Sequence, residues 1–175
     1  WPDRADVPKN AARALRYLDR YVTVTQGEVF YVTEALAQLE GLERGPAGNT
    51  SLAAALAIAR EMDRDQIVVV QETEYTGAGK HPTAQLSFAR QQGVEIRRGD
   101  PRENVPGKAI VLPTNPGQIS VVDYNLDSAR RSYLRKATEG YSVEDLDPVD
   151  LEFLADETRW SKEKVNEEIG HGLQR

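Results

Sequence analysis

The sequence DQIVVVQETEYTGAGKH, at residues 65–81, constrains the fold more than any other stretch of the chain. Residues 67–70 form an unbroken β-branched run, which is typical of a parallel strand covered on both faces. The hydroxyl of Thr76 then stands beside Gly77 and Gly79. Open α/β sheets bind their ligands at the carboxyl ends of their strands. We therefore predict a buried strand that ends in a ligand-binding turn.

A glycine-rich loop and a small-residue helix precede this stretch. Residues 45–48 are Gly-Pro-Ala-Gly, and the sequence after them predicts a helix that reaches Met62, with Asn49, Thr50 or Ser51 as its N-cap. Loop, helix, strand and turn in this order indicate a ligand site. The turn alone also fits an ordinary strand-to-helix connection that needs glycine for its backbone dihedrals, and both interpretations stay open.

The remaining periodicities predict alternating helices and strands. Expected helices lie at 8–21, 34–42 (with Thr33 as N-cap), 82–90 and 127–138, and expected strands lie at 28–32 and 108–113, besides a short extended piece at 22–25. This alternation predicts an α/β fold with an open, mostly parallel sheet flanked by helices.

An acidic module follows this α/β part, so we expect one domain at 1–138 and a small acidic helical appendage at 139–175. Its expected N-caps are Asp147 and Ser161, and its expected apolar anchors are Leu151, Phe153, Leu154 and Trp160. Between residues 144 and 168, ten acidic residues stand against three basic ones. Such a surface repels a phosphate backbone, so the module favours docking or oligomerisation over DNA binding.

The composition excludes several classes of function. The net charge is −6 and the pI is near 5.1, which argues against nucleic-acid and membrane-surface partners. The chain has no cysteine, so it has no disulfide and no thiolate nucleophile, and two distant histidines do not predict a metal site. No apolar run is long enough to span a bilayer. We expect a soluble, cytoplasmic protein.

The order of these features resembles the carboxyl-terminal part of the fold-type-II pyridoxal-phosphate (PLP) enzymes, the relatives of the tryptophan synthase β chain. In that family an acidic-glycine-apolar segment, here residues 40–42, and a proline-alanine loop precede a small-residue helix. The next strand ends in serine or threonine followed by glycines. The resemblance implies that Thr76 hydrogen-bonds the pyridine nitrogen of PLP, while Gly77 and Gly79 shape the turn beneath the ring.

Residues 72–82 and 99–108 narrow this resemblance, because they are similar to the β subunits of the 2-amino-4-ketopentanoate thiolases. That group implies a PLP-dependent acyltransferase of ornithine degradation, which works with a small α subunit. It moves an acetyl group between coenzyme A and an alanine-derived carbanion. The implied substrates are D-alanine or 2-amino-4-ketopentanoate, together with acetyl-CoA.

The chain departs from the family's pattern in ways that affect catalysis. Gly45 and Gly48 stand where many relatives carry an acidic residue and a serine, and the family's phosphate-binding loop has no equivalent. No lysine here matches the motif of the Schiff-base lysine. The resemblance therefore implies that this lysine lies on an upstream half or a companion subunit, with Lys80 as the alternative. No catalytic residue is assigned within the chain.

Several charged residues allow two interpretations each. Glu72 and Glu74 fit an acid–base pair or, more commonly, a solvated strand end. The pair Arg97-Arg98 and the basic residues at 130–136 fit phosphate binding to coenzyme A, or a solvated face or subunit contact. Two other functions also stay open: a non-catalytic module that binds a cofactor or nucleotide, and a structural assembly domain built on the acidic tail.

Overall fold

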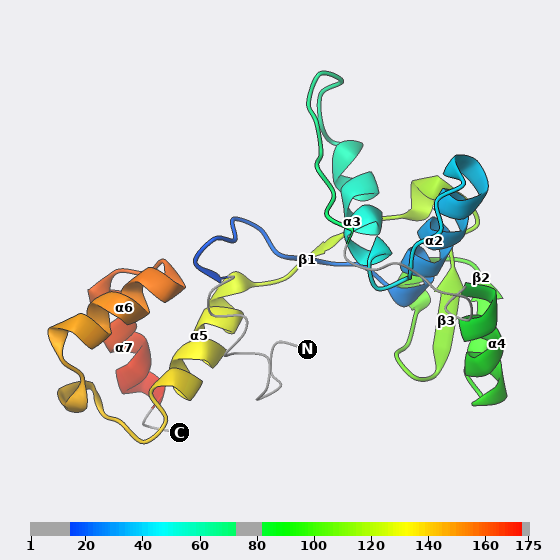
Figure 1. The fold of residues 1–175 in the computed structure, drawn as a ribbon. Coiled ribbons are helices and arrows are strands. Elements are labelled where there is room, and N and C mark those ends of the chain that lie inside the picture. Colours follow the sequence, from blue (N-terminus) through cyan, green and yellow to red (C-terminus); the bar gives the residue numbers. More distant parts are fainter. Residues whose placement is uncertain (1–14, 73–81, 173–175) are drawn as a thin grey trace. The chain divides into compact units, whose positions relative to one another are not determined.

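The computed structural model describes residues 15–72 and 82–172 and divides them into two compact units (Figure 1). One unit spans Val22–Val122, and the other combines residues 15–21 with 123–172. Strands β1 (Val22–Thr23) and β4 (Val122–Asp123) pair where the chain passes between the units. The helix after β4 belongs to the second unit. The domain boundary that the sequence suggests, between residues 138 and 139, stays a prediction.

The Val22–Val122 unit is an α/β structure, rich in helix and with a small sheet. Strands β2 (Glu95–Arg98) and β3 (Ala109–Leu112) are parallel, with Glu95 opposite Ala109 and Arg98 opposite Leu112. The α/β class is thus confirmed, but the parallel sheet among the described residues has only two strands. The other elements are α2 (Gln26–Glu40), α3 (Asn49–Ala59), α4 (Pro82–Gln91) and the 3-10 turns η1 (Pro101–Glu103) and η2 (Pro116–Gln118).

Helix α2 corrects the predicted strand at 28–32 and the predicted cap at Thr33. Thr25 is the N-cap, and Glu28 completes a capping box with it, so the helix begins well before Thr33. The hydroxyl of Thr33 instead donates to the carbonyl of Val29 inside the helix, at 2.8 Å. The helix ends at Gly41, whose φ of 65° suits glycine. The β-branched residues of this segment therefore lie in a helix, because capping and packing outweigh their strand propensity.

The core of this unit joins α2 and α3, which contact each other in Figure 1. Its buried members are Val29, Val32, Ala53, Ala57 and Ile119. Helix α2 also approaches β3 closely at Gly27. A Cβ at Gly27 would lie 1.8 Å from the carbonyl oxygen of Val111, so only glycine permits this contact.

The predicted buried strand at 67–70 is wrong for the described chain. These residues are in no strand, and the side chains of Ile67 and Val69 are 85% and 89% exposed. The segment extends away from α3 as a long loop (Figure 1). A parallel strand is buried by the strands and helices around it. No strand of the part that the structure describes pairs with residues 67–70.

The second unit is helical, with η3 (Val143–Asp145), α5 (Leu126–Ala137), α6 (Pro148–Thr158) and α7 (Lys162–Gly172). As predicted, Asp147 caps α6 by accepting from the amides of Val149 and Asp150, at 2.7 and 2.8 Å. Ser161 accepts from the amide of Lys164 at the start of α7, at 3.2 Å. The core consists of Leu15, Tyr133, Leu134, Leu154, Val165 and Ile169, with Leu151 and Trp160 packed against it.

Two expectations for this unit are corrected. Phe153 is 56% exposed and does not anchor the core, because it lies on the outer face of α6. The expected helix at 8–21 is outside the described residues before Leu15, and from Arg16 to Tyr21 the chain is not helical. The helices expected at 82–90 and 127–138 and the strand expected at 108–113 are confirmed within a residue or two. No described helix has the length and apolar character needed to cross a membrane.

Candidate functional site

The three predicted cofactor-binding residues, Thr76, Gly77 and Gly79, lie outside the described residues, as does Lys80. The structure describes the chain up to Glu72 before this turn and from the next helix after it. The described segments that bear on the candidate site are the loop before α3, the end of segment 67–72, and the first turn of α4.

The loop at 45–48 and the start of α3 lie against the chain that leads into the turn. Gly48 is the N-cap of α3 and makes no side-chain cap, so the predicted capping by Asn49, Thr50 or Ser51 is wrong. The hydroxyl of Ser51 lies 2.9 Å from the Gly48 carbonyl oxygen and 3.1 Å from that of Gln71. Ser51 thus connects the first turn of α3 to the end of segment 67–72.

A buried polar chain lies directly beneath the start of α3. The amide nitrogen Nδ2 of Asn49 donates to the hydroxyl of Thr33 at 3.0 Å, and that hydroxyl donates to Val29 on α2. Asn49 is fully buried, and its Oδ1 accepts no hydrogen bond from a described residue. Buried amide oxygens nearly always accept a hydrogen bond, so this oxygen is an acceptor available to a ligand.

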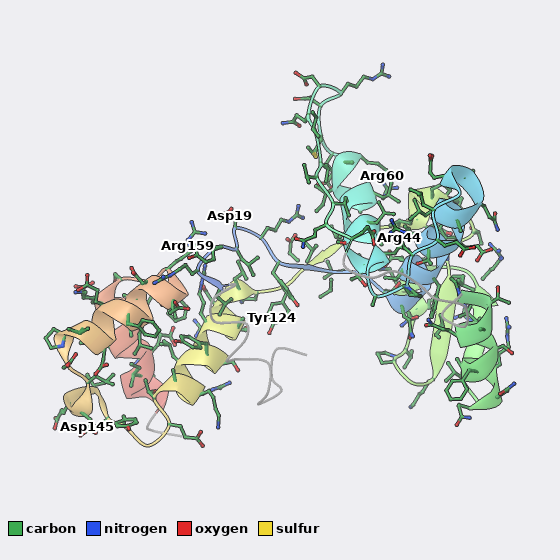
Figure 2. The ribbon with its side chains drawn as sticks, in the orientation of Figure 1. Asp19, Arg44, Arg60, Tyr124, Asp145 and Arg159 are labelled. Atoms are coloured by element: carbon green, nitrogen blue, oxygen red, sulfur yellow. The ribbon has the colours of Figure 1, made fainter. Side chains whose placement is uncertain are left out.

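Glu72 is a buried carboxylate at the end of segment 67–72. Both of its oxygens are buried, and no described group donates to them. Burial raises the pKa of this carboxyl above its ordinary value, while the positive charge of Arg44 (labelled in Figure 2) partly opposes the rise. Glu74, the other half of the hypothesised acid–base pair, lies outside the described residues. A carboxylate whose pKa is raised by burial is a candidate proton-transfer group.

Glu28 is a second buried carboxylate, but its surroundings give it a structural role. Its Oε1 accepts from the amide of Ser120 at 2.8 Å, and its Oε2 accepts from the amide and the hydroxyl of Thr25 at 2.6 and 2.8 Å. Arg102 forms an ion pair with it. This network joins α2 to two distant loops and was not found from the sequence. The spacing Thr25-x-x-Glu28 was the local signal for its first half.

Helix α3 is also fixed at its other end, at Arg60 (Figure 2). The guanidinium of Arg60 donates to the carbonyls of Pro116 and Gly117, at 3.2 and 3.0 Å, and to that of Ile119. The start and end of α3 are therefore both tied to neighbouring chain. This places the loop at 45–48 on a rigid element, as precise binding sites require.

A cavity of about 660 Å³ lies between α2, α4, β2 and β3. Arg97 and Arg98 line it, together with Arg90 of α4 and apolar side chains. In contrast, Arg130 and Arg131 of the helical unit form ion pairs with Asp127 and Glu168, at 2.8 and 2.9 Å. The two basic clusters thus belong to different units, and only the first lines this cavity. Arg97 of the first cluster also pairs with Glu95 and Glu103. No group of described residues is arranged to hold a metal ion.

These features define an α/β protein with a glycine-rich loop at the start of α3 and a basic cavity beside α4. The chain matches no protein-family model and no solved structure. Among curated proteins, it is 64% identical over 169 residues to a protein named 2-amino-4-ketopentanoate thiolase beta subunit, from an unknown prokaryotic organism. A protein of the same name from Acetoanaerobium sticklandii is 59% identical over 169 residues. Each alignment covers 97% of this chain and 36% of the relative, so the chain spans about a third of those proteins.

Proposed function

We propose that this chain is part of a PLP-dependent 2-amino-4-ketopentanoate thiolase β subunit and contributes one side of the cofactor site. The observation that carries the proposal is the identity of 64% and 59% to two proteins of that name, over nearly the whole chain. The proposed enzyme exchanges an acetyl group between coenzyme A and an alanine-derived carbanion. Its substrates are D-alanine or 2-amino-4-ketopentanoate, and acetyl-CoA.

The described residues around the turn are compatible with a bound PLP ring. The loop glycines Gly45 and Gly48 are buried, and α3 begins with small side chains, so the backbone there is not covered by bulky groups. The Oδ1 of Asn49 and the carboxylate oxygens of Glu72 accept no hydrogen bond from a described residue, so each is an acceptor available to a ligand. Bound PLP supplies an electron sink that stabilises a carbanion at the amino-acid α carbon.

In the proposed enzyme, the residues of this chain position PLP and tune its chemistry, and they do not form the covalent bond to it. The hydroxyl of Thr76 is proposed to hydrogen-bond the pyridine nitrogen, and Gly77 and Gly79 allow the backbone to pass close beneath the ring. The contact between Ser51 and Gln71 fixes the chain before this turn. Glu72, whose pKa is raised by burial, is proposed to exchange a proton near the ring.

The reactive lysine and the small α subunit are proposed to lie outside these 175 residues. The relatives are nearly three times as long as the aligned segment, so they contain polypeptide that could carry the lysine. Neighbouring strands for residues 67–70 would come from the same polypeptide. The exposed β-branched side chains of Ile67 and Val69 favour such a covering partner.

The test is an absorbance scan between about 300 and 500 nm on the complete β polypeptide with its companion subunit, combined with intact mass before and after borohydride. The proposal expects an absorbance band and a fixed mass addition that maps outside this chain. Thr76→Val should shift the band and weaken PLP binding, whereas Ser87→Ala, at an exposed position of α4, should change neither. A mass addition at Lys80 would contradict the placement of the lysine. Absence of both signals would favour the non-catalytic binding module.

A further inference from the structure

The cavity between α2, α4, β2 and β3 is lined by both apolar and basic side chains. Helix α2 faces it with residues spaced four apart, including Phe30, Glu34 and Gln38, and α4 does the same with Leu86 and Arg90. This spacing places each set on one face of its helix. The cavity volume of about 660 Å³ lies within the range of small-molecule and cofactor sites.

The walls of this cavity are largely apolar. Phe30 is buried, Ile96 and Leu112 are partly buried, and Leu86 adds a side chain from the opposite helix. Such walls favour a ligand with an aromatic ring or a methylene chain, since burying those groups removes apolar surface from water. A small amino acid would leave most of this surface uncovered.

The same cavity is lined by the guanidinium groups of Arg90, Arg97 and Arg98 and by the carboxylate of Glu34. Glu95 and Glu103 pair with Arg97, so Arg90 and Arg98 supply the positive charge available to a ligand. Arg97 and Arg98 are successive residues of β2, and Arg90 comes from α4, so the charges approach from two elements. Guanidinium groups bind phosphate oxygens through parallel hydrogen bonds. The cavity therefore fits a ligand that is both apolar and multiply phosphorylated.

The neighbours of these arginines fix them in place and leave donors for a ligand. Arg97 pairs with Glu95 at 3.2 Å and with Glu103, which holds its side chain beside β2. Arg98 contacts the Pro113 carbonyl at 3.5 Å through one nitrogen. Each guanidinium carries five N–H donors, so both side chains can bind a phosphate while keeping these contacts.

We propose that this cavity binds the phosphorylated adenosine end of coenzyme A. The proposal rests on the proposed function, which requires an acyl-CoA substrate. Coenzyme A carries a flat base and several phosphates, which match the apolar walls and the arginines of the cavity. The cavity also includes Pro82 and Thr83, in the first turn of α4, which follow the proposed cofactor turn in the sequence.

The experiment measures the affinity of coenzyme A by titration calorimetry on the complete β polypeptide with its companion subunit. Arg90→Gln and Arg98→Gln each remove one charge from the cavity, and Arg64→Gln removes one from an exposed position in the loop after α3 as a matched control. We expect each cavity variant to weaken coenzyme A binding about ten-fold or more, since a guanidinium donates charge-assisted hydrogen bonds to phosphate oxygens. Arg64→Gln should leave the affinity unchanged.

Two further measurements separate the possible causes. Dephospho-coenzyme A lacks one phosphate, so a cavity variant that loses a contact to this phosphate should bind coenzyme A and dephospho-coenzyme A about equally. The PLP absorbance band should stay the same in all three variants, and KM for acetyl-CoA should rise more than kcat falls.

Several outcomes would overturn the assignment. Unchanged coenzyme A affinity in both cavity variants, with native circular dichroism, would place the ligand elsewhere. Equal weakening by Arg64→Gln would show that the effect comes from the general charge of the protein and not from the cavity. Loss of PLP in place of coenzyme A would assign the arginines to the cofactor. A complete protein that contains no PLP would contradict the proposed function, whereas calorimetry would still report whether the cavity binds coenzyme A.

Discussion

Replacing Glu28 by alanine should severely destabilise the Val22–Val122 unit, because this carboxylate is fully buried and joins three parts of the chain. Its removal leaves the amides of Thr25 and Ser120 without their acceptor, and it leaves Arg102 without its carboxylate. A buried donor left unsatisfied costs about 1–3 kcal/mol. Removing one partner of a buried ion pair costs about 3–5 kcal/mol in total.

The cost of removing one partner of a buried ion pair, about 3–5 kcal/mol, is the better guide to the loss of stability. Arg102 is one-third exposed, so water can hydrate part of its charge after the substitution. The Thr25 hydroxyl can rotate toward another acceptor, whereas the Ser120 amide is fixed in the backbone. We therefore expect a loss of about 3–5 kcal/mol. Because domains are commonly stable by only 5–15 kcal/mol, this is a large part of the total.

Amide hydrogen exchange on peptides from α2 measures this loss within the unit itself. A loss of about 3–5 kcal/mol predicts exchange that is roughly a hundred-fold to several-thousand-fold faster. Glu40→Ala is the matched control, since Glu40 is an exposed glutamate in the last turn of the same helix. That variant should change exchange little. Equal exchange in the two variants would refute the reasoning about the buried network.

Three further predictions concern packing and charge. Leu154→Ala should destabilise the helical unit by about 2–5 kcal/mol, because Leu154 is 5% exposed within its core, and urea titration followed by tryptophan fluorescence checks this. Gly27→Ala should lower the thermal midpoint measured by circular dichroism, since its Cβ would overlap a backbone carbonyl, whereas Gly170→Ala, with nothing within 4 Å, should not. The raised pKa of Glu72 gives stability that is complete below the unfolded-state pKa and is lost as the pH rises through the folded-state pKa. Glu72→Gln should abolish that loss, as urea midpoints measured across the acidic range would show.

The sequence predicts most of the helices because their signals are local. Asp147 before Pro148, Ser161 before α7 and the proline that opens α4 are start signals contained in a few residues. Gly93, with a φ of 80°, ends α4 as glycine commonly does. Such elements need no information about distant parts of the chain, and the structure places them within a residue or two of the prediction.

The error at α2 has a different cause. The capping box of Thr25 and Glu28 was present in the sequence, but the β-branched and aromatic residues after it favoured a strand. Distant contacts decide between helix and strand here, because Glu28 also accepts a hydrogen bond from the amide of Ser120, 92 residues away. A contact across that separation leaves no periodicity to detect. The buried network was therefore beyond sequence pattern alone.

Residues 67–70 show that a β-branched run does not by itself determine whether a buried strand forms. A continuous β-branched run specifies burial on both faces, but the neighbouring strands decide whether burial occurs. The end of this run is already fixed, because Ser51 contacts the carbonyl of Gln71 at 3.1 Å. What it lacks among the described residues is a strand at either edge. Under the proposed function, the polypeptide outside this third of the protein supplies those strands.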